Sequence, residues 1–286
     1  MKIKQFIYAL ALVSVLISCR ASQEEPVANT INEFHNEKST TVLVAAHRGA
    51  HNGNSENSIS SIKHAIEIGV DIVELDVRVS KDGIAVLMHD GRIDRTTNGK
   101  GKVEDYTLEE LKKFRLKTWY GSVSDEQIPT FEEALRVVKG KIMVDIDIKT
   151  SNVKAIVEAV KKTGTQQEVF YFDNDYLGLD EIKQLDNSSK FMPRAYSLKM
   201  ADSALVRFNP PAIHIDPKFY TVEVVDLIKG KGARVWINAL GEADCRLRGG
   251  SREEVMNQLL AKGANMIQTD EPEIILQYLR EKELHN

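Results

Sequence analysis

The sequence predicts an α/β protein: a TIM-type (β/α)8 barrel with a small insertion after the third strand. Three observations favour this fold. The chain has 286 residues, enough for one barrel of about 250 residues. From residue 42 onward, short β-branched runs alternate with helical stretches, as in parallel strands joined by helical crossovers. No Gly-x-Gly-x-x-Gly turn follows the first strand, which argues against a dinucleotide-binding, doubly wound sheet.

Nine segments have strand character, one more than the barrel needs. They are 42–46, 71–77, 84–88, 142–148, 168–172, 191–197, 212–215, 233–238 and 265–269. Helical periodicity occupies 57–68, 130–139, 152–163, 175–186, 198–207, 221–230, 251–262 and 272–282. The second and third strands leave no room for a helix between them, so they are predicted to form a hairpin. Residues 91–129 break the alternation and are predicted to be the insertion.

The predicted hairpin brings a histidine toward two carboxylates. Glu74 and Asp76 are two apart in a strand, so their side chains share a face. If Asp82-Gly83 is a two-residue turn, Asp76 pairs with His89, and directly opposed residues share a face. A register slip of one residue would move His89 to the other face.

The beginning of the chain resembles an export signal. Lys2 and Lys4 precede an apolar run over 6–17, which is too short to span a membrane. Leu16-Ile17-Ser18-Cys19 resembles the bacterial lipoprotein box, although an ordinary secretory signal is the alternative. We therefore expect a lipoprotein signal peptide at 1–18, a lipidated Cys19, a flexible tether at 19–40 with room for a short helix at about 29–38, and a barrel domain at 41–286. The expected location is a membrane-anchored lipoprotein facing the periplasm or the cell surface.

The overall charge excludes one class of partner. The formal net charge is −4 and there is no tract of lysine and arginine, so nucleic acid is not an expected partner. Few cations would be needed to bind one phosphate group, and these would not show in the total.

Polar residues end several strands, where barrel active sites lie. His47-Arg48-Gly49 ends the first strand, and Glu74 and Asp76 lie on a strand that otherwise looks buried. Two buried carboxylates on one face repel each other, and a divalent cation relieves that repulsion. Asp145, Asp147 and Lys149 again share one face of a strand, so any of them could point inward. Such a set suits phosphoryl transfer, in which cations neutralise phosphate and imidazoles move protons.

Other polar residues receive a plainer interpretation. His51 is expected in a solvated loop, with a place beside the site as the alternative, and His64 at the surface or in the packing of a helix. His214 and Asp216 end a late strand, and a place at the barrel mouth is the less favoured interpretation of them.

At this point the chain resembles the glycerophosphodiester phosphodiesterase family over about residues 42–280. The resemblance rests on the order of nine blocks. They are His47-Arg48-Gly49, Glu56-Asn57, Glu74-Leu75-Asp76, Lys81-Asp82-Gly83, His89-Asp90 with 94–99, Ile128-Pro129-Thr130, Asp147-Ile148-Lys149, Val235-Trp236-Ile237-Asn238 and Thr269-Asp270-Glu271-Pro272.

The resemblance implies metal-dependent hydrolysis of a glycerophosphodiester to sn-glycerol 3-phosphate and an alcohol, with Ca²⁺ or Mg²⁺ as cofactor. The implied residues and roles are these: Glu74, Asp76 and Asp147 as metal ligands; His47 and His89 as the acid/base pair; Arg48 as a phosphate contact; Lys149 as a substrate-side cation; and Trp236 as an apolar pocket wall.

The chain departs from the family pattern at two informative places. It has Asp147 where the family usually has Glu, and Tyr171-Phe172 where a Ser-Phe pair is frequent. Two alternatives remain open from the sequence. One is a phospholipase C- or D-like enzyme acting on intact phospholipid, and the other is an inactive barrel serving as a binding lipoprotein.

Overall fold

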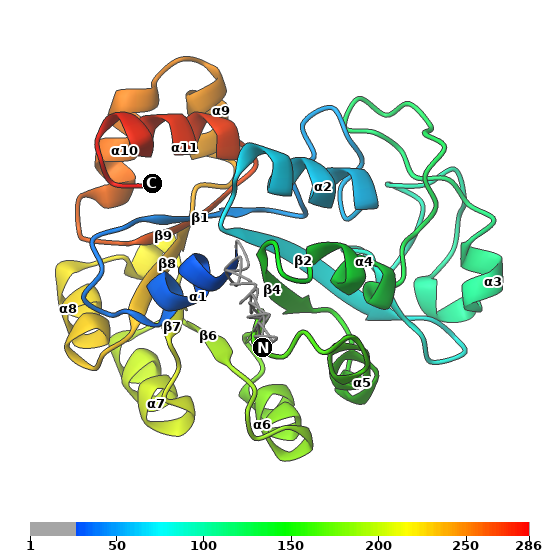
Figure 1. The fold of residues 1–286 in the computed structure, drawn as a ribbon, viewed down its shortest axis with the longest axis horizontal. Helices are drawn as coiled ribbons and strands as arrows, with labels where there is room; N and C mark the ends of the chain where they lie inside the picture. The colour runs from blue at the N-terminus through cyan, green and yellow to red at the C-terminus, as the bar shows by residue number, and fades with distance from the viewer. Residues whose placement is uncertain (1–26, 286) are drawn as a thin grey trace, which may run out of the picture.

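The computed structural model describes residues 27–285, and these residues form a closed barrel of parallel strands (Figure 1). The strands are β1 (Leu43–Ala46), β2 (Ile72–Val79), β3 (Ala85–Leu87), β4 (Met143–Ile148), β5 (Val169–Asp173), β6 (Phe191–Ala195), β7 (Ala212–Ile215), β8 (Arg234–Asn238) and β9 (Met266–Thr269). Their order is β1-β9-β8-β7-β6-β5-β4-β2-β3, and pairing of β1 with β2 closes the ring. Only β3 is antiparallel, so the predicted eight-stranded barrel with one hairpin is confirmed.

Helices surround the barrel, as the periodicity predicts. They are α1 (Val27–His35), α2 (Ile59–Ile68), α3 (Leu108–Leu111), α4 (Phe131–Val138), α5 (Val153–Thr163), α6 (Tyr176–Leu185), α7 (Leu198–Phe208), α8 (Val222–Gly230), α9 (Glu242–Arg248), α10 (Arg252–Leu260) and α11 (Pro272–Glu281). Hydroxyl and amide side chains begin many of them. Thr130, for example, accepts from the backbone N–H of Glu133, and the Glu133 side chain reaches back to the Thr130 backbone. This reciprocal cap satisfies donors that a helix start leaves free.

The barrel interior is apolar at its base and polar at its mouth. Alternate residues of each strand point inward, and the first of them build one core cluster that includes Leu43, Ile72, Met143, Phe170 and Met266. The strands' other faces pack under the helices in a second, larger cluster. The polar inward residues come later along the strands, so the fold gathers them at the carboxyl end of the barrel.

Residues 27–35, part of the predicted flexible tether, form α1, close to the short helix that the sequence allowed at about 29–38, and they are packed rather than flexible. Val27 and Phe34 are buried in the cluster at the barrel base, and Phe34 stacks on Phe170 with ring centres 4.7 Å apart. In Figure 1 α1 lies across the ring of strands. Its apolar residues cover core positions that the strands alone would leave exposed, and this burial outweighs the polar composition of the segment. Cys19 and the signal-peptide prediction lie outside the described residues.

The predicted hairpin register is also wrong, by one residue. Val77 pairs with Leu87, and the Met88 N–H donates to the Asp76 carbonyl oxygen at 3.0 Å. The cause is the turn: Ser80 N–H donates to the Ile84 carbonyl oxygen, which leaves a three-residue loop rather than a two-residue one. Gly83 has φ = 83°, the left-handed conformation that such a loop requires. His89 therefore lies beyond the paired strand, and its position depends on other contacts.

Residues 91–129 fold over the β2–β3 hairpin and have a small core of their own. Val86, Met88, Ile93, Leu111 and Leu116 are among its buried members. Val86 and Arg78 are cross-strand partners, so this core covers the continuation of the β2 face that lines the barrel. Within the described part of the chain, no helix has the length and apolar character needed to cross a bilayer.

Candidate active site

Four adjacent strands, β9, β1, β2 and β4, bring polar side chains to the carboxyl end of the barrel. Pairing of Ala46 with Thr269 places the following residues, His47 and Asp270, side by side. Asp76 pairs with Asp147 in the parallel ladder between β2 and β4. Residues separated by up to 223 positions thus meet at one site.

Glu74, Asp76 and Asp147 converge, as the sequence predicts. Each offers a carboxylate oxygen, and these three atoms lie within 4.8 Å of one another. Glu74 and Asp76 are buried, with 1% and 0% of their surface exposed. Burial raises the pKa of Glu74 well above its ordinary value, and Asp76 and Asp147 add to the effect. Burial, with Asp76 next in effect, raises the pKa of Asp147 to about 7.

Neighbouring groups hydrogen-bond to some of these carboxylate oxygens and leave others without a partner among the described residues. The Arg48 backbone N–H donates to Glu74 Oε2 at 2.7 Å, and the Asn57 amide donates to Asp76 Oδ2 at 2.7 Å. Lys149 Nζ lies 2.7 Å from Asp147 Oδ2 and 3.4 Å from Asp76 Oδ1. Glu74 Oε1 is buried without a hydrogen-bond partner among the described residues.

The three carboxylates fit a hard divalent cation. Oxygen ligands are those that Ca²⁺ and Mg²⁺ prefer, and a cation would relieve both the mutual repulsion and the open Glu74 oxygen. Asp145 faces the same interior one step nearer the base, paired in register with Glu74. Burial raises its pKa well above the ordinary value, and it lies outside the three-carboxylate group.

His47 is oriented by a carboxylate that sequence reasoning left without a role. Its Nδ1 lies 2.7 Å from Asp270 Oδ1, and its Nε2 lies 4.0 Å from Glu74 Oε2. Burial lowers the pKa of His47, although the hydrogen bond to Asp270 opposes that effect. Nδ1 therefore donates to Asp270, which leaves the Nε2 lone pair directed to the carboxylate side of the site.

His51 is not the solvated loop residue that was expected. It is 3% exposed, its Nε2 lies 3.2 Å from Asp270 Oδ1, and its ring packs on Trp119 of the insertion at 5.0 Å. Burial tends to raise the pKa of Asp270, but the hydrogen bonds from His47 and His51 hold it below its ordinary value. Asp270 could have been suspected from the sequence, because it directly follows the last strand.

Two sets of contacts hold His89 in place. Its Nδ1 lies 2.7 Å from Asp90 Oδ1, and Arg95 donates to Asp90 and to Glu56. Hydrogen bonding from Arg95, the main cause, holds the pKa of Asp90 below its ordinary value. Arg48 also donates to Glu56, at 3.0 Å. A chain of alternating charges thus connects the His89 side chain to the strand end that carries His47.

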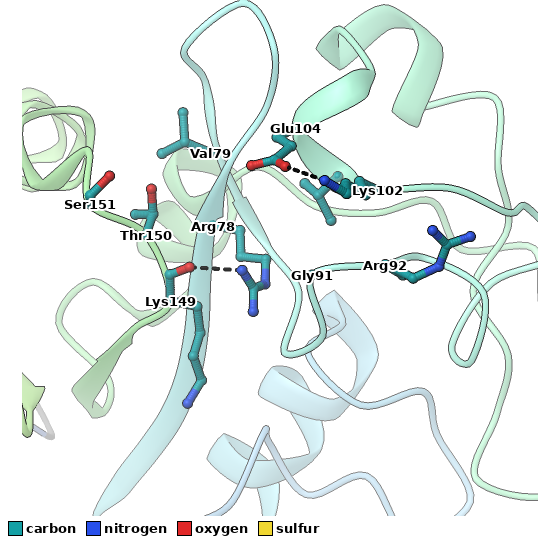
Figure 2. Close-up of a pocket in the computed structure, with 10 residues that line it drawn as sticks. Arg78, Val79, Gly91, Arg92, Lys102, Glu104, Lys149, Thr150 and Ser151 are labelled. Carbon is teal, nitrogen blue, oxygen red and sulfur yellow. Dashed lines mark hydrogen bonds and ion pairs between the residues drawn. The ribbon is translucent and has the colours of Figure 1, made fainter.

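The backbone of His89 is held by Arg78. The Nε and Nη2 atoms of Arg78 donate to the His89 carbonyl oxygen at 3.0 and 2.8 Å. Its Nη1 donates to the Lys149 carbonyl oxygen at 2.8 Å, which Figure 2 shows. One guanidinium therefore joins the segment after β3 to the end of β4. The sequence gives Arg78 no distinct signal, because its partners are backbone atoms of remote residues.

Trp236 lies in the barrel rather than at an open surface. It is 0% exposed, belongs to the basal apolar cluster and donates from Nε1 to Asn238 Oδ1 at 3.0 Å. Its predicted contact with substrate stays a prediction.

This combination defines a class of protein: a barrel hydrolase for phosphate esters. A buried carboxylate cluster, two histidines held by aspartates and cations at the same rim can bind an anionic ester and move protons on either side of it.

Comparison with known proteins agrees. The model of the glycerophosphoryl diester phosphodiesterase family matches residues 47–227. The glycerophosphodiester phosphodiesterase of Caldanaerobacter subterraneus is 30% identical over 248 residues, covering 83% of this chain and 98% of that protein. The chain belongs to the glycerophosphoryl diester phosphodiesterase family, and it is a phosphoric diester hydrolase.

Solved structures support the same assignment. A glycerophosphoryl diester phosphodiesterase from Parabacteroides distasonis is 26% identical, with a TM-score of 0.80 over 91% of this chain and 93% of that one. A phosphodiesterase from Oleispira antarctica, solved in complex with the product sn-glycerol-3-phosphate, is 26% identical, with a TM-score of 0.72 over 83% of this chain and 96% of that one.

Proposed function

We propose that this enzyme hydrolyses glycerophosphodiesters to sn-glycerol 3-phosphate and an alcohol, in a reaction that depends on a divalent metal ion and two histidines. The proposal rests on the three-carboxylate group beside His47, which has oxygen atoms available to a metal ion. The sn-glycerol-3-phosphate bound by the Oleispira antarctica relative supports the choice of product.

Glu74, Asp76 and Asp147 would hold the ion, Ca²⁺ or Mg²⁺, through oxygen atoms. The bound ion would neutralise charge on the phosphate oxygens. Arg48 and Lys149 contribute positive charge at the same place. Burial alone would lower the pKa of Lys149, but Asp147 and Asp76 hold that pKa above its ordinary value. Lys149 therefore stays a cation at neutral pH. Arg48 lies 3.3 Å from Asp76 through its Nε atom.

The two histidines divide the proton transfers. His47 acts as the general base through Nε2, because Asp270 occupies Nδ1. His89, with its Nδ1 on Asp90, acts as the general acid and protonates the departing alkoxide. The nucleophile is the glycerol 2-hydroxyl, which gives a cyclic phosphate that water opens; direct attack by water is the variant.

A second candidate function is hydrolysis of intact phospholipid. It is favoured by the exposed aromatic residues of the insertion, Trp119 at 47% and Tyr120 at 76%. Aromatic side chains with one apolar and one wet side suit a membrane interface.

A substrate panel tests the proposal. Glycerophosphodiesters and short-chain phospholipids are incubated with the purified enzyme in Ca²⁺, in Mg²⁺ and in chelator, and released glycerol 3-phosphate is measured. Release from glycerophosphodiesters that stops in chelator is expected. Release of diacylglycerol, phosphatidate or headgroup from phospholipid alone would favour the second candidate. Full activity in chelator would contradict the proposed dependence on a metal ion.

We also propose that the chain is exported and anchored through a lipid on Cys19, because a small residue directly precedes Cys at the end of the apolar run. Replacing Cys19 by Ala should move the protein from the membrane fraction to the soluble fraction. Unchanged fractionation would contradict the lipid anchor.

A further inference from the structure

A cavity of about 360 Å³ opens beside the barrel mouth, between the ends of β2 and β4 and the insertion. Three of the residues that line it are cationic, Arg78, Arg92 and Lys102, and one is acidic, Glu104. Lys149 also borders the cavity, but its Nζ lies 2.7 Å from Asp147 Oδ2. Figure 2 shows that these side chains come from three separate segments. The hydroxyl residues Thr150 and Ser151 complete the wall. A cavity with this lining suits an anion.

The cavity continues the active-site face. Along β2, Glu74, Asp76 and Arg78 alternate on one face. The ladder continues beyond β4, because the Lys149 N–H donates to the Val77 carbonyl oxygen. Asp76 is therefore followed by Arg78 about 7 Å further along the same strand, while the Lys149 ammonium turns back to Asp147 and Asp76. A group bound at Arg78 would belong to the molecule whose phosphate lies at the carboxylates.

Arg78 lines the cavity and has no carboxylate as a direct partner among the described residues. Its hydrogen bonds go to the carbonyl oxygens of His89 and Lys149. No ion pair within 4.0 Å involves it in the part of the chain that the structure describes. Two carbonyl oxygens solvate a guanidinium without neutralising it, so this partly buried cation keeps charge available to a ligand.

Arg92 and Lys102 form the outer wall, and their existing ion pairs are weak. The two residues face each other across an isolated antiparallel bridge. Arg92 pairs with Asp94 at 3.1 Å, and Lys102 pairs with Glu104 at 3.2 Å, a contact drawn in Figure 2. Both cationic side chains are more than half exposed. Exposed pairs of this kind contribute little, so a ligand anion can compete for them.

We propose that this cavity is a specificity subsite that binds a carboxylate or phosphate group on the alcohol part of the phosphodiester. The inference rests on the proposed function and adds to it a class of substrate: diesters whose leaving alcohol carries its own negative charge. The same cations disfavour an alcohol whose only charge is a quaternary ammonium group, because like charges repel.

A matched pair of substrates tests the subsite. sn-Glycero-3-phosphoserine and sn-glycero-3-phosphoethanolamine differ by one carboxylate, so the ratio of their kcat/KM values isolates the anion. A charge-assisted hydrogen bond is worth enough for about a tenfold preference for the serine substrate. In the double variant Arg92→Gln, Lys102→Gln this ratio should fall toward one, mainly through a higher KM for the serine substrate.

Lys113→Gln is the control, because Lys113 is an exposed lysine of the same insertion that pairs with Glu109 at 3.6 Å and is not part of the cavity wall. It should leave both kcat/KM values as in the wild type. Equal kcat/KM values for the two substrates in the wild type would overturn the subsite, and so would a wild-type ratio retained by the double variant. Absence of glycerol 3-phosphate release from both substrates would instead overturn the proposed function, and the subsite with it.

Discussion

His47 Nδ1 lies 2.7 Å from Asp270 Oδ1, across the pairing of the first and last strands of the barrel. The contact joins two side chains of the active site that directly follow the first and last strands of the barrel. It fixes which imidazole nitrogen carries the proton and leaves Nε2 to accept one. Asp270 is thus a positioning residue for the proposed base.

Asp270→Asn should lower kcat by about 10²–10⁴-fold, because an amide stabilises neither the required tautomer nor the charged imidazole. Loss of the carboxylate also lowers the pKa of His47 further, so the acidic limb of the pH–rate profile should move to lower pH. Steady-state rates across pH measure both effects. Glu273→Gln is the control, since Glu273 lies near the same helix start but contacts His64. A mutant with wild-type kcat would refute the assignment.

His89→Ala should lose about 10²–10⁴-fold in kcat on an ordinary diester. On a substrate with a very acidic leaving alcohol the same variant should recover much of its rate, because that alcohol departs without a proton. His47→Ala should stay slow on both substrates, since the nucleophile still needs a base. If instead His47→Ala is the variant that recovers, the two roles are exchanged.

Arg78→Lys should lower kcat about tenfold with little change in melting temperature, because a single ammonium cannot hold the carbonyl oxygens of His89 and Lys149 with the same geometry. Arg78→Met should be slower still, so that lysine gives partial rescue. Arg115→Lys is a matched control, since Arg115 also donates to two carbonyl oxygens, those of Lys112 and Phe114, but within the insertion. A similar loss of kcat in both lysine variants would mean that the effect is only structural.

The metal-free enzyme should lose stability as pH rises. The pKa of Asp147 is raised by burial to about 7 in the folded chain, above its ordinary value near 3.9. Its stabilising contribution is therefore complete below the unfolded value and is lost as pH rises through about 7. Glu74 and Asp145 act in the same direction. Melting temperature in chelator should fall between about pH 5 and about pH 8, and Ca²⁺ or Mg²⁺ should restore it.

Two variants separate the carboxylates in this experiment. Asp147→Asn should flatten the fall in melting temperature and weaken the response to metal, because it removes a proposed ligand. Asp145→Asn should also flatten the fall but keep the metal response, since Asp145 lies outside the three-carboxylate group. A melting temperature that rises with pH in the chelated wild type would contradict the charge repulsion.

The fold was largely accessible from sequence because the signals that carry it are local. Alternating periods mark the strands and helices, and spacing by two places Glu74 with Asp76, and Asp145 with Asp147, on one face of their strands. The hairpin register was missed because it depends on whether the turn around Gly83 has two or three residues, and Asp-Gly permits both. Asp270, His51 and Arg78 received no role because their partners are remote in the chain. Of the three, Asp270 alone had a local signal, its position directly after the last strand.

Helix α1 at the base of the barrel bears on which end of the barrel would face the membrane. Arg234, buried at the lower end of β8, donates to the carbonyl oxygens of Glu33 and Thr41 and so ties the entering chain to the floor of the barrel. Cys19 is eight positions before Val27, a reach of at most about 28 Å. With a lipid on Cys19, the base of the barrel would lie close to the bilayer, and the end that carries the active site would face the surrounding water. This orientation would favour water-soluble diesters as substrates and would disfavour the second candidate function, because intact lipids of the same membrane would lie at the opposite end of the barrel from the active site.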